Sequence, residues 1–536
     1  MSIAWKQVNE LNLGFRDAEN YKRHENRELF NKIFIRTAML DRLCKPSTFF
    51  LVGEKGTGKT AYAVYLANND FKNTLASLRY IRETEYQKFV AMKKEKQLTL
   101  SDYTNIWKVI IYLLMAQQIR ERENRFPILG DLVKYSALKR AIDEFYNRAF
   151  APEILYAIQF AEEAKIGAEL LAKYQELGAN IGGEDKQTTT FAESRFQTNL
   201  LYIQRAFESA LSSLKISHNQ ILFIDGIDIR PSSIPYEDYS DCVKGLANAV
   251  WAVNNDFFSN IKDSRGRLRV VLLIRPDIFN SLDLQNQNSK IRDNSAVLNW
   301  LTTYPEHRRS EIFLMADRLL SSQQEQILDV GEAWDHYFPY DAPSVSSRQT
   351  TTSSFISFLR YSLYRPRDIL TILEIQKENF LEQSRKTSDV FQESDFTSAA
   401  FTRKYSDYLL GEVKDHLAFY YSADDYEMLM KFFQYLHGNS RFTYDEYLTA
   451  FTEYDAFLTR NMPAKPSFCD TADNFLQFLY DLNVICYIID VEPEPFFSFC
   501  YRDRTPSNIA PKVRGGVRYD VHYGVRKALD LGRHLR

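Results

Sequence analysis

The chain has little of three features that would point directly to a compartment or a partner. Its formal net charge is only −3 over 536 residues, so no overall field favours nucleic acid or a membrane surface, and any such contact has to be local. Its five cysteines are odd in number, scattered and without a C-x-x-C spacing, which predicts reduced thiols and no zinc site. The longest apolar run, residues 106–116, contains Lys108 and is too short to span a bilayer.

The beginning of the chain also lacks the apolar core of a secretory signal peptide. With the reduced cysteines, this predicts a cytoplasmic protein without membrane contact. The hydrophobic content of 45% is typical of folded globular proteins, and the length predicts about three or four domains.

What the chain does contain is a phosphate-binding loop. An apolar strand at residues 48–52 runs into the P-loop signature G-x-x-x-x-G-K-T at residues 53–60, and a helical pattern follows. The glycines let consecutive backbone N–H groups face one anion, and the helix start adds its positive end. Lys59 is expected on the outer phosphates and Thr60 on Mg²⁺. The predicted nucleotide-binding residues are Gly53, Glu54, Lys55, Gly56, Thr57, Gly58, Lys59, Thr60 and Ala61.

A second apolar strand, residues 220–225, ends in the sequence Asp-Gly-Ile-Asp. A carboxylate at the C-terminal end of a buried parallel strand is where a P-loop protein holds its second Mg²⁺ partner. Asp225 is therefore predicted to share the metal with Thr60, and Asp228 is a candidate catalytic base. Four apolar residues and an aspartate occur in many strands, so the prediction depends on the P-loop upstream.

Several arginines are candidates for contacts with the nucleotide. The strand predicted at residues 268–274 is apolar throughout, which is typical of a central parallel strand, and it ends in Arg275. Arg275 is either a sensor of the γ-phosphate or a surface arginine before a proline turn. Arg367 opens a helix of a predicted lid and is expected to reach the nucleotide, and Arg308 and Arg309 are candidate arginine fingers.

The patterns divide the chain into four parts. Residues 1–46 lead into the core, and residues 47–330 form the P-loop core with a helical insertion at about 86–217 that includes a helix at 152–177. Residues 331–420 form a helical lid and connector, and residues 312–315 are either a last strand or the start of a helix. In residues 421–536, helices at 424–436, 443–451 and 471–482 precede strands at 484–489 and 496–501, which is the order of a winged helix.

The last 36 residues carry nine lysines and arginines against three aspartates. Such a local excess is suited to the phosphates of DNA. A solvated basic tail or a protein-binding face explains it equally well.

In this order, the motifs resemble the additional-strand branch of P-loop ATPases. The Asp-Gly-Ile-Asp ending, Arg275-Pro276 after the third strand and Arg-Pro-Arg-Asp at 365–368 resemble STAND and KAP-type bacterial ATPases, which are similar in layout to the origin-recognition class of AAA+ proteins. The resemblance covers residues 13–375. It implies a parallel α/β fold, ATP with Mg²⁺, nucleotide-gated self-assembly or binding of a separate effector protein, and roles in phage defence or DNA transactions.

One position departs from the AAA+ pattern. AAA+ enzymes usually place a glutamate directly after the metal-binding aspartate, and this chain has Gly226 there. The main hypothesis is therefore a slow switch ATPase that gates self-assembly or an effector in antiviral defence. One alternative is an ATP-controlled DNA-binding protein that uses residues 421–536. Another is a scaffold that holds nucleotide without turnover.

Overall fold

The computed structural model describes residues 4–81, 100–123, 136–147, 193–230, 234–343, 353–382, 390–462, 464–491 and 496–532. The chain forms two compact units. The sheet unit consists of Ala38–Gly53 and Lys59–Val297, and the helical unit consists of Met1–Thr37, Glu54–Gly58 and Leu298–Arg536. The P-loop sequence thus contributes residues to both units.

The sheet unit is built on five parallel strands in the order β2-β3-β4-β1-β5. They are β1 (Phe50–Val52), β2 (Thr74–Tyr80), β3 (Asn219–Asp225), β4 (Leu268–Ile274) and β5 (Ser295–Val297). Strand β4 is buried along its whole length, as expected for a central strand covered on both faces. This is the strand order of the additional-strand P-loop NTPases, to which the AAA+ proteins belong, and it confirms the predicted fold class.

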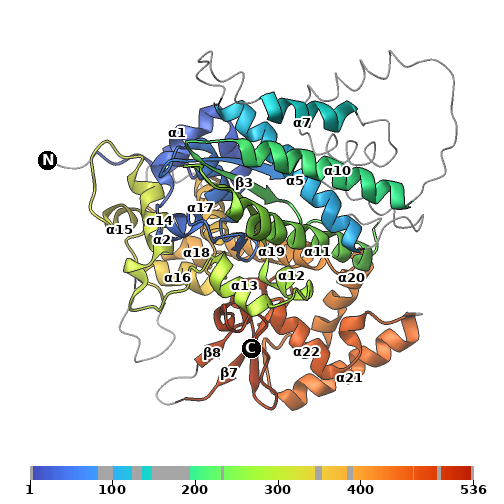
Figure 1. Cartoon of the computed structure of the whole chain (residues 1–536). Coiled ribbons are helices and arrows are strands. Elements are labelled where there is room, and N and C mark those ends of the chain that lie inside the picture. Colours follow the sequence, from blue (N-terminus) through green and yellow to red (C-terminus); the bar gives the residue numbers. More distant parts are fainter. Residues whose placement is uncertain are drawn as a thin grey trace, which may run out of the picture. The chain divides into compact units, whose positions relative to one another are not determined.

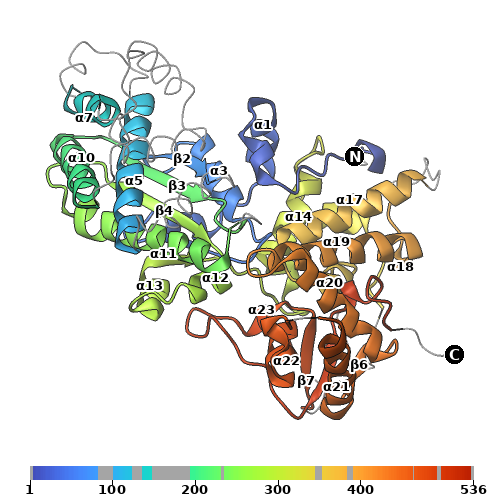
Figure 2. The same ribbon diagram turned by 90° about the vertical axis from the view of Figure 1, so that its right-hand side faces the viewer.

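Helices cover both faces of this sheet. Helix α3 (Lys59–Asn68) follows β1 and packs on β2, whereas α5 (Leu100–Glu123) packs on β3 and on α11 (Tyr236–Ala252). Figure 2 shows α5 and α3 on opposite sides of the strands. Helices α7 (Ser136–Asn147) and α10 (Glu193–Ser213) pack together beside α5. The helix predicted at 152–177 lies outside the described residues.

Short helices complete the unit: α2 (Ala38–Leu43), α12 (Pro276–Ser281) and α13 (Gln287–Asn294). In the part of the chain that the structure describes, no helix combines the length and apolarity needed to cross a bilayer.

The helical unit begins with α1 (His24–Ile33) and continues after the sheet with six further helices before the C-terminal domain. They are α14 (Glu311–Ser321), α15 (Glu332–Tyr337), α16 (Phe355–Tyr361), α17 (Pro366–Glu382), α18 (Glu393–Thr397) and α19 (Ala399–Leu417). Their core is aromatic: the Trp334 ring lies 4.9 Å from Phe355 and 4.8 Å from Phe358 between centroids. Residues 312–315 belong to α14, so of the two alternatives the start of a helix is correct. The last strand of the five-stranded sheet is β5, which comes earlier in the chain.

The C-terminal domain has the winged-helix order (Figure 1). Helices α20 (Ala423–Phe432), α21 (Tyr444–Asn461) and α22 (Ala472–Asp481) precede the hairpin of β7 (Ile485–Ile489) and β8 (Phe496–Ser498). The strand predicted at 496–501 stops at Ser498, because a helical turn, α23 (Cys500–Asp503), follows. The basic segment also contains a strand, β9 (Arg518–Val521), which pairs with β7 and with β6 (Arg441–Phe442).

We predict opposite effects of alanine at two helical glycines. A Cβ at Gly245 in α11 would lie 2.5 Å from Tyr103 Cβ in α5, so Gly245→Ala should destabilise the sheet unit by about 1–3 kcal/mol. A Cβ at Gly411 in α19 would meet no heavy atom of the described residues within 4 Å, so Gly411→Ala should stabilise its helix by about 0.5–1 kcal/mol. Thermal denaturation measures both. Equal melting temperatures for the two variants would contradict the tight α5–α11 contact.

Candidate nucleotide-binding site

Three of the predicted site residues, Lys59, Thr60 and Asp225, lie in the sheet unit near the ends of β1 and β3. Lys59 begins α3, and its Nζ donates a hydrogen bond to the Gly53 carbonyl at 2.8 Å. The Thr60 Oγ1 hydroxyl donates to Asp225 Oδ2 at 2.6 Å. The structure therefore brings together Lys59, Thr60 and Asp225, which the sequence places 165 residues apart.

Asp225 is a buried carboxylate with a second acid nearby. Burial, and then the negative charge of Asp228, raise the pKa of Asp225 above its ordinary value. The Thr60 hydroxyl, Lys59 and the Gly226 N–H, which donates at 2.8 Å, act in the opposite direction without cancelling that rise. A cation beside Asp225 would relieve this repulsion.

Hydroxyl and carboxylate oxygens are the ligand types that Mg²⁺ prefers, and Mg²⁺ is usually held by one or two protein oxygens together with phosphates and water. Thr60 and Asp225 fit that requirement. Among the residues that the structure describes, no group of three or more His, Cys, Asp or Glu side chains is arranged to hold a metal by protein ligands alone.

The backbone conformation and a close neighbour explain why a glycine follows Asp225. Gly226 has φ +87°, and a Cβ there would lie 2.8 Å from the Ile81 carbonyl oxygen. A side chain at this position is therefore strained both by its backbone and by its neighbour. The usual AAA+ glutamate does not fit here, and the next acid along the loop is the half-buried Asp228.

Arg275 lies at the end of β4 with only 1% of its side chain exposed. Its guanidinium holds Asp277 through two hydrogen bonds, Nε to Oδ1 at 3.0 Å and Nη2 to Oδ2 at 2.5 Å. The surface-arginine alternative is therefore wrong, while a role in sensing the γ-phosphate stays a prediction. In the helical unit, Arg308 forms a similar two-bond pair with Asp335, at 2.9 Å and 2.5 Å.

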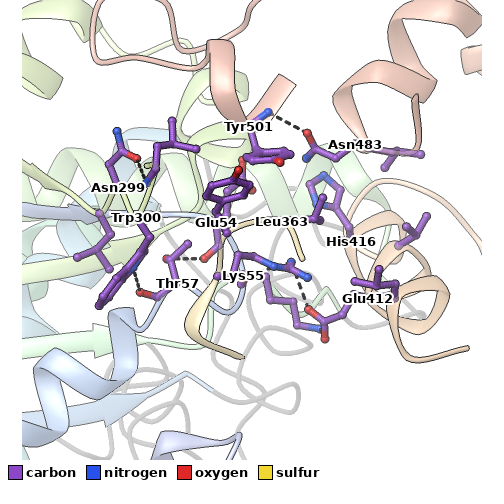
Figure 3. A pocket seen from close by; sticks show the side chains of 17 residues that line it. Glu54, Lys55, Thr57, Asn299, Trp300, Leu363, Glu412, His416, Asn483 and Tyr501 are labelled. Carbon is purple, nitrogen blue, oxygen red and sulfur yellow. Dashed lines mark hydrogen bonds and ion pairs between the residues drawn. The ribbon is translucent and has the colours of Figure 1, made fainter. Parts of the chain in front are cut away.

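The middle of the P-loop, residues Glu54–Gly58, belongs to the helical unit. Three successive carbonyl oxygens accept hydrogen bonds there: Lys55 O from Arg365 Nη1 at 3.0 Å, Gly56 O from the Arg367 N–H at 3.3 Å, and Thr57 O from Trp300 Nε1 at 2.9 Å. Arg365 is itself fixed by Asp368, at 2.9 Å and 2.7 Å. Figure 3 shows this side of the loop, where Glu54, Lys55 and Thr57 line a cavity with Trp300 and Tyr501.

Both charged side chains of the loop are paired with distant residues. Glu54 forms an ion pair with Arg504, just after α23. Lys55 pairs with two acids of α19, Asp415 and Glu412, the latter at 3.5 Å. Glu412 Oε1 also lies 3.6 Å from Nη1 of Arg367, so the predicted lid arginine contacts the loop backbone and this acid.

These partners were not predicted as site residues. Trp300 and Arg504 stand out in the sequence only as an aromatic residue before a helix and as one of many basic residues near the end. Glu412 lies in a helix with a mixed polar face. No local spacing connects any of the three to the P-loop, because the contacts join residues separated by more than 240 positions.

Much of the C-terminal basic excess is used in contacts within the helical unit. Arg502 donates to Tyr364 Oη at 2.7 Å, Arg526 pairs with Asp520 at 2.6 Å, and Arg518 pairs with Asp490. Lys512, Arg514 and Lys527 are exposed, as is the paired Arg518. Arg533 and Arg536 lie outside the described residues.

The third helix of the winged helix is tied to the following loop. Gln477 of α22 donates from Nε2 to Pro511 O at 3.1 Å and accepts from Val513 N–H at 2.9 Å. Asp473 of the same helix accepts from Tyr444 Oη at 2.7 Å. Two polar side chains of α22 are thus engaged within the domain, and Lys512 lies between the two residues that Gln477 contacts.

The chain matches no known protein-family profile, and no curated protein sequence matches it. Among solved structures, it is similar to the Orc1 protein of Aeropyrum pernix in complex with DNA, with 13% identity and a TM-score of 0.35. The alignment covers 94% of this chain and 92% of that one. Because this identity and this TM-score are low, they do not carry the fold assignment. The AAA+-like P-loop fold is assigned from the strand order of the sheet and from the residues at the ends of β1 and β3.

We predict that Asp225→Asn raises thermal stability in the absence of Mg²⁺ and nucleotide. Folding raises the pKa of Asp225, so the folded state becomes less stable as pH rises above the ordinary pKa of an aspartate. At neutral pH the ionised Asp225 carboxylate therefore lowers the free energy of unfolding. Asparagine removes that charge, and a gain of about 1 kcal/mol would raise the melting temperature by about 2–4 °C. The control is Asp263→Asn, which removes an exposed acid of the same unit away from Asp225, with little change expected. A lower melting temperature for Asp225→Asn at neutral pH would contradict this account.

We also predict that a glutamate at position 226 does not restore an AAA+ catalytic base. Gly226→Glu should destabilise the sheet unit by about 1–3 kcal/mol, since it forces a side chain into a positive-φ position against Ile81. Gly226→Ala should show most of the same loss, which separates the backbone effect from the carboxylate. Denaturant unfolding gives the values, and full stability with faster hydrolysis in Gly226→Glu would refute the steric argument.

Proposed function

We propose that this protein is an ATP-binding and ATP-hydrolysing regulatory switch that uses Mg²⁺. The single observation that carries the proposal is the contact between Thr60 Oγ1 and Asp225 Oδ2 at 2.6 Å. It supports one Mg²⁺ held by the first residues of the P-loop helix and by the end of the neighbouring core strand, which is the arrangement that phosphoryl transfer in P-loop proteins requires.

In this proposal each residue has one role. Lys59 binds the outer phosphates, and Thr60 and Asp225 hold Mg²⁺, which neutralises charge on the phosphates when it is bound. Asp228 orients the attacking water. Hydrolysis is slow because Gly226 occupies the position where AAA+ enzymes carry a glutamate.

The biological role extends this proposal. Slow turnover suits a protein whose ATP-bound state gates self-assembly or a separate effector, and the resemblance of Asp225–Asp228 to the STAND arrangement supports an antiviral defence role. ATP as the nucleotide rests on the same resemblance.

DNA binding by the winged helix is a second candidate. The exposed Lys512 and Arg514 of the loop beside α22 favour it, since exposed lysines and arginines supply phosphate contacts. In this reading the loop before β9, more than α22 itself, would meet the DNA backbone. Such binding would weaken steeply with salt and be lost in a Lys512→Ala, Arg514→Ala double variant.

Phosphate release from the full chain with ATP and Mg²⁺ tests the main proposal. We expect turnover below about 1 s⁻¹, the low end of enzyme rates, abolished by Lys59→Ala or by EDTA and reduced at least tenfold by Asp228→Asn. The control is Asp263→Asn, an exposed acid of the sheet unit at φ +58°, where asparagine is equally tolerated. Duplex DNA is added in a parallel series, and stimulation would favour the second candidate.

Three outcomes would change the conclusion. Turnover of tens per second would contradict a switch. ATP retention without phosphate release would favour the scaffold alternative. Failure of the wild-type protein to bind ATP would refute the proposal.

A further inference from the structure

The side of the P-loop that faces away from the phosphate position is held by residues from far along the chain. In a phosphate-binding loop the N–H groups converge on the anion, so the carbonyl groups have to point outward and need other partners. Here the carbonyls of Lys55, Gly56 and Thr57 have those partners in Arg365, Arg367 and Trp300. Three consecutive carbonyls are therefore fixed by the helical unit.

The side chains of the loop are held in the same way. Lys55 pairs with Glu412 and Asp415 of α19, and Glu54 pairs with Arg504. The acidic Glu54 thus pairs with a basic residue that follows α23, and the basic Lys55 pairs with acidic residues of α19. This complementarity fixes which way each side chain turns.

Arg504 is well placed to act as an anchor. Its Nε donates to Ile509 O at 2.9 Å and its Nη2 lies 3.3 Å from Cys500 Sγ, so Nη1 is the part of the fork directed at Glu54. The preceding Asp503 accepts hydrogen bonds from Tyr480 at 2.5 Å and from Tyr487 at 3.3 Å, which fixes the turn that carries Arg504 to the winged-helix domain. Burial lowers the pKa of Arg504 to about 10, so the guanidinium remains charged at neutral pH.

We propose that Arg504 is a positioning residue for the P-loop: its ion pair with Glu54 ties the winged-helix domain to the loop and preorganises the loop for phosphate. Glu412 acts in the same way on Lys55. Coupling of this kind is reciprocal, so nucleotide in the loop must also strengthen the contact of the winged-helix domain with Glu54. The nucleotide part of this inference rests on the proposed ATP binding, whereas the holding of the loop does not.

Hydrogen exchange of the full chain without nucleotide tests the holding of the loop. We expect Arg504→Gln and Glu54→Gln each to speed exchange of the amides of residues 54–58 by about tenfold, a typical coupling. The control is Arg518→Gln, which breaks another ion pair of the same domain, with Asp490, and should leave loop exchange unchanged. The charge-reversed double variant, Glu54→Lys with Arg504→Glu, should recover most of the protection, which a merely destabilised domain would not show.

Nucleotide affinity tests the coupling. With a fluorescent, non-hydrolysable ATP analogue and Mg²⁺, we expect Arg504→Gln to raise Kd about tenfold and the double variant to restore it. In the wild type, the analogue should slow exchange of residues 496–504, and this slowing should be lost in Glu54→Gln.

The results separate the two proposals. Loop exchange that is unchanged in both single variants, or a double variant no better than the single ones, overturns the role of Arg504. Affected exchange with an unchanged Kd overturns the coupling. A wild-type chain that binds no nucleotide refutes the proposed function, while the exchange experiment still decides whether Arg504 holds the loop.

Discussion

A phosphate-binding loop has to turn its N–H groups inward, and the structure depends on how the resulting outward carbonyls are satisfied. A loop of glycines loses much conformational entropy when it is fixed in one shape. In this chain, the cost is offset by donors from Trp300, Arg365 and Arg367, all of which come from the helical unit. This explains why residues Glu54–Gly58 group with the helical unit while both flanking segments group with the sheet.

The same division shows what each unit supplies. The sheet aligns the ends of β1 and β3, so that Thr60 and Asp225 meet at 2.6 Å, and it buries Asp225 enough to raise its pKa. The helical unit supplies the shape of the loop. Asp225 thus belongs to one unit, and the donors to the loop carbonyls belong to the other.

The sequence alone predicted the features that local patterns encode. Strand β4 was predicted with its exact bounds because a fully buried strand is apolar throughout, and Lys59, Thr60 and Asp225 were found through a signature and a strand end. Strand β5 was missed because three residues are too few to show periodicity. Strand β9 was missed because charged residues dominate its segment and hide the alternation of polar and apolar side chains that indicates a strand. Arg504 and Glu412 could not be assigned, because an ion pair between distant residues leaves no local pattern.

The proposed slow hydrolysis and the proposed coupling of the winged-helix domain to the P-loop would suit the same kind of molecule. A switch has to keep its nucleotide long enough for a distant surface to respond, and excluding a glutamate at position 226 by contact with Ile81 removes the usual means of fast turnover. In the proposal, the ion pair between Glu54 and Arg504 would give the winged-helix domain an energetic link to the bound phosphates. Fast turnover would make such a link short-lived. The steric restriction at Gly226 and the ion pair between Glu54 and Arg504 therefore both favour the proposed switch, in which the nucleotide-bound state carries the function.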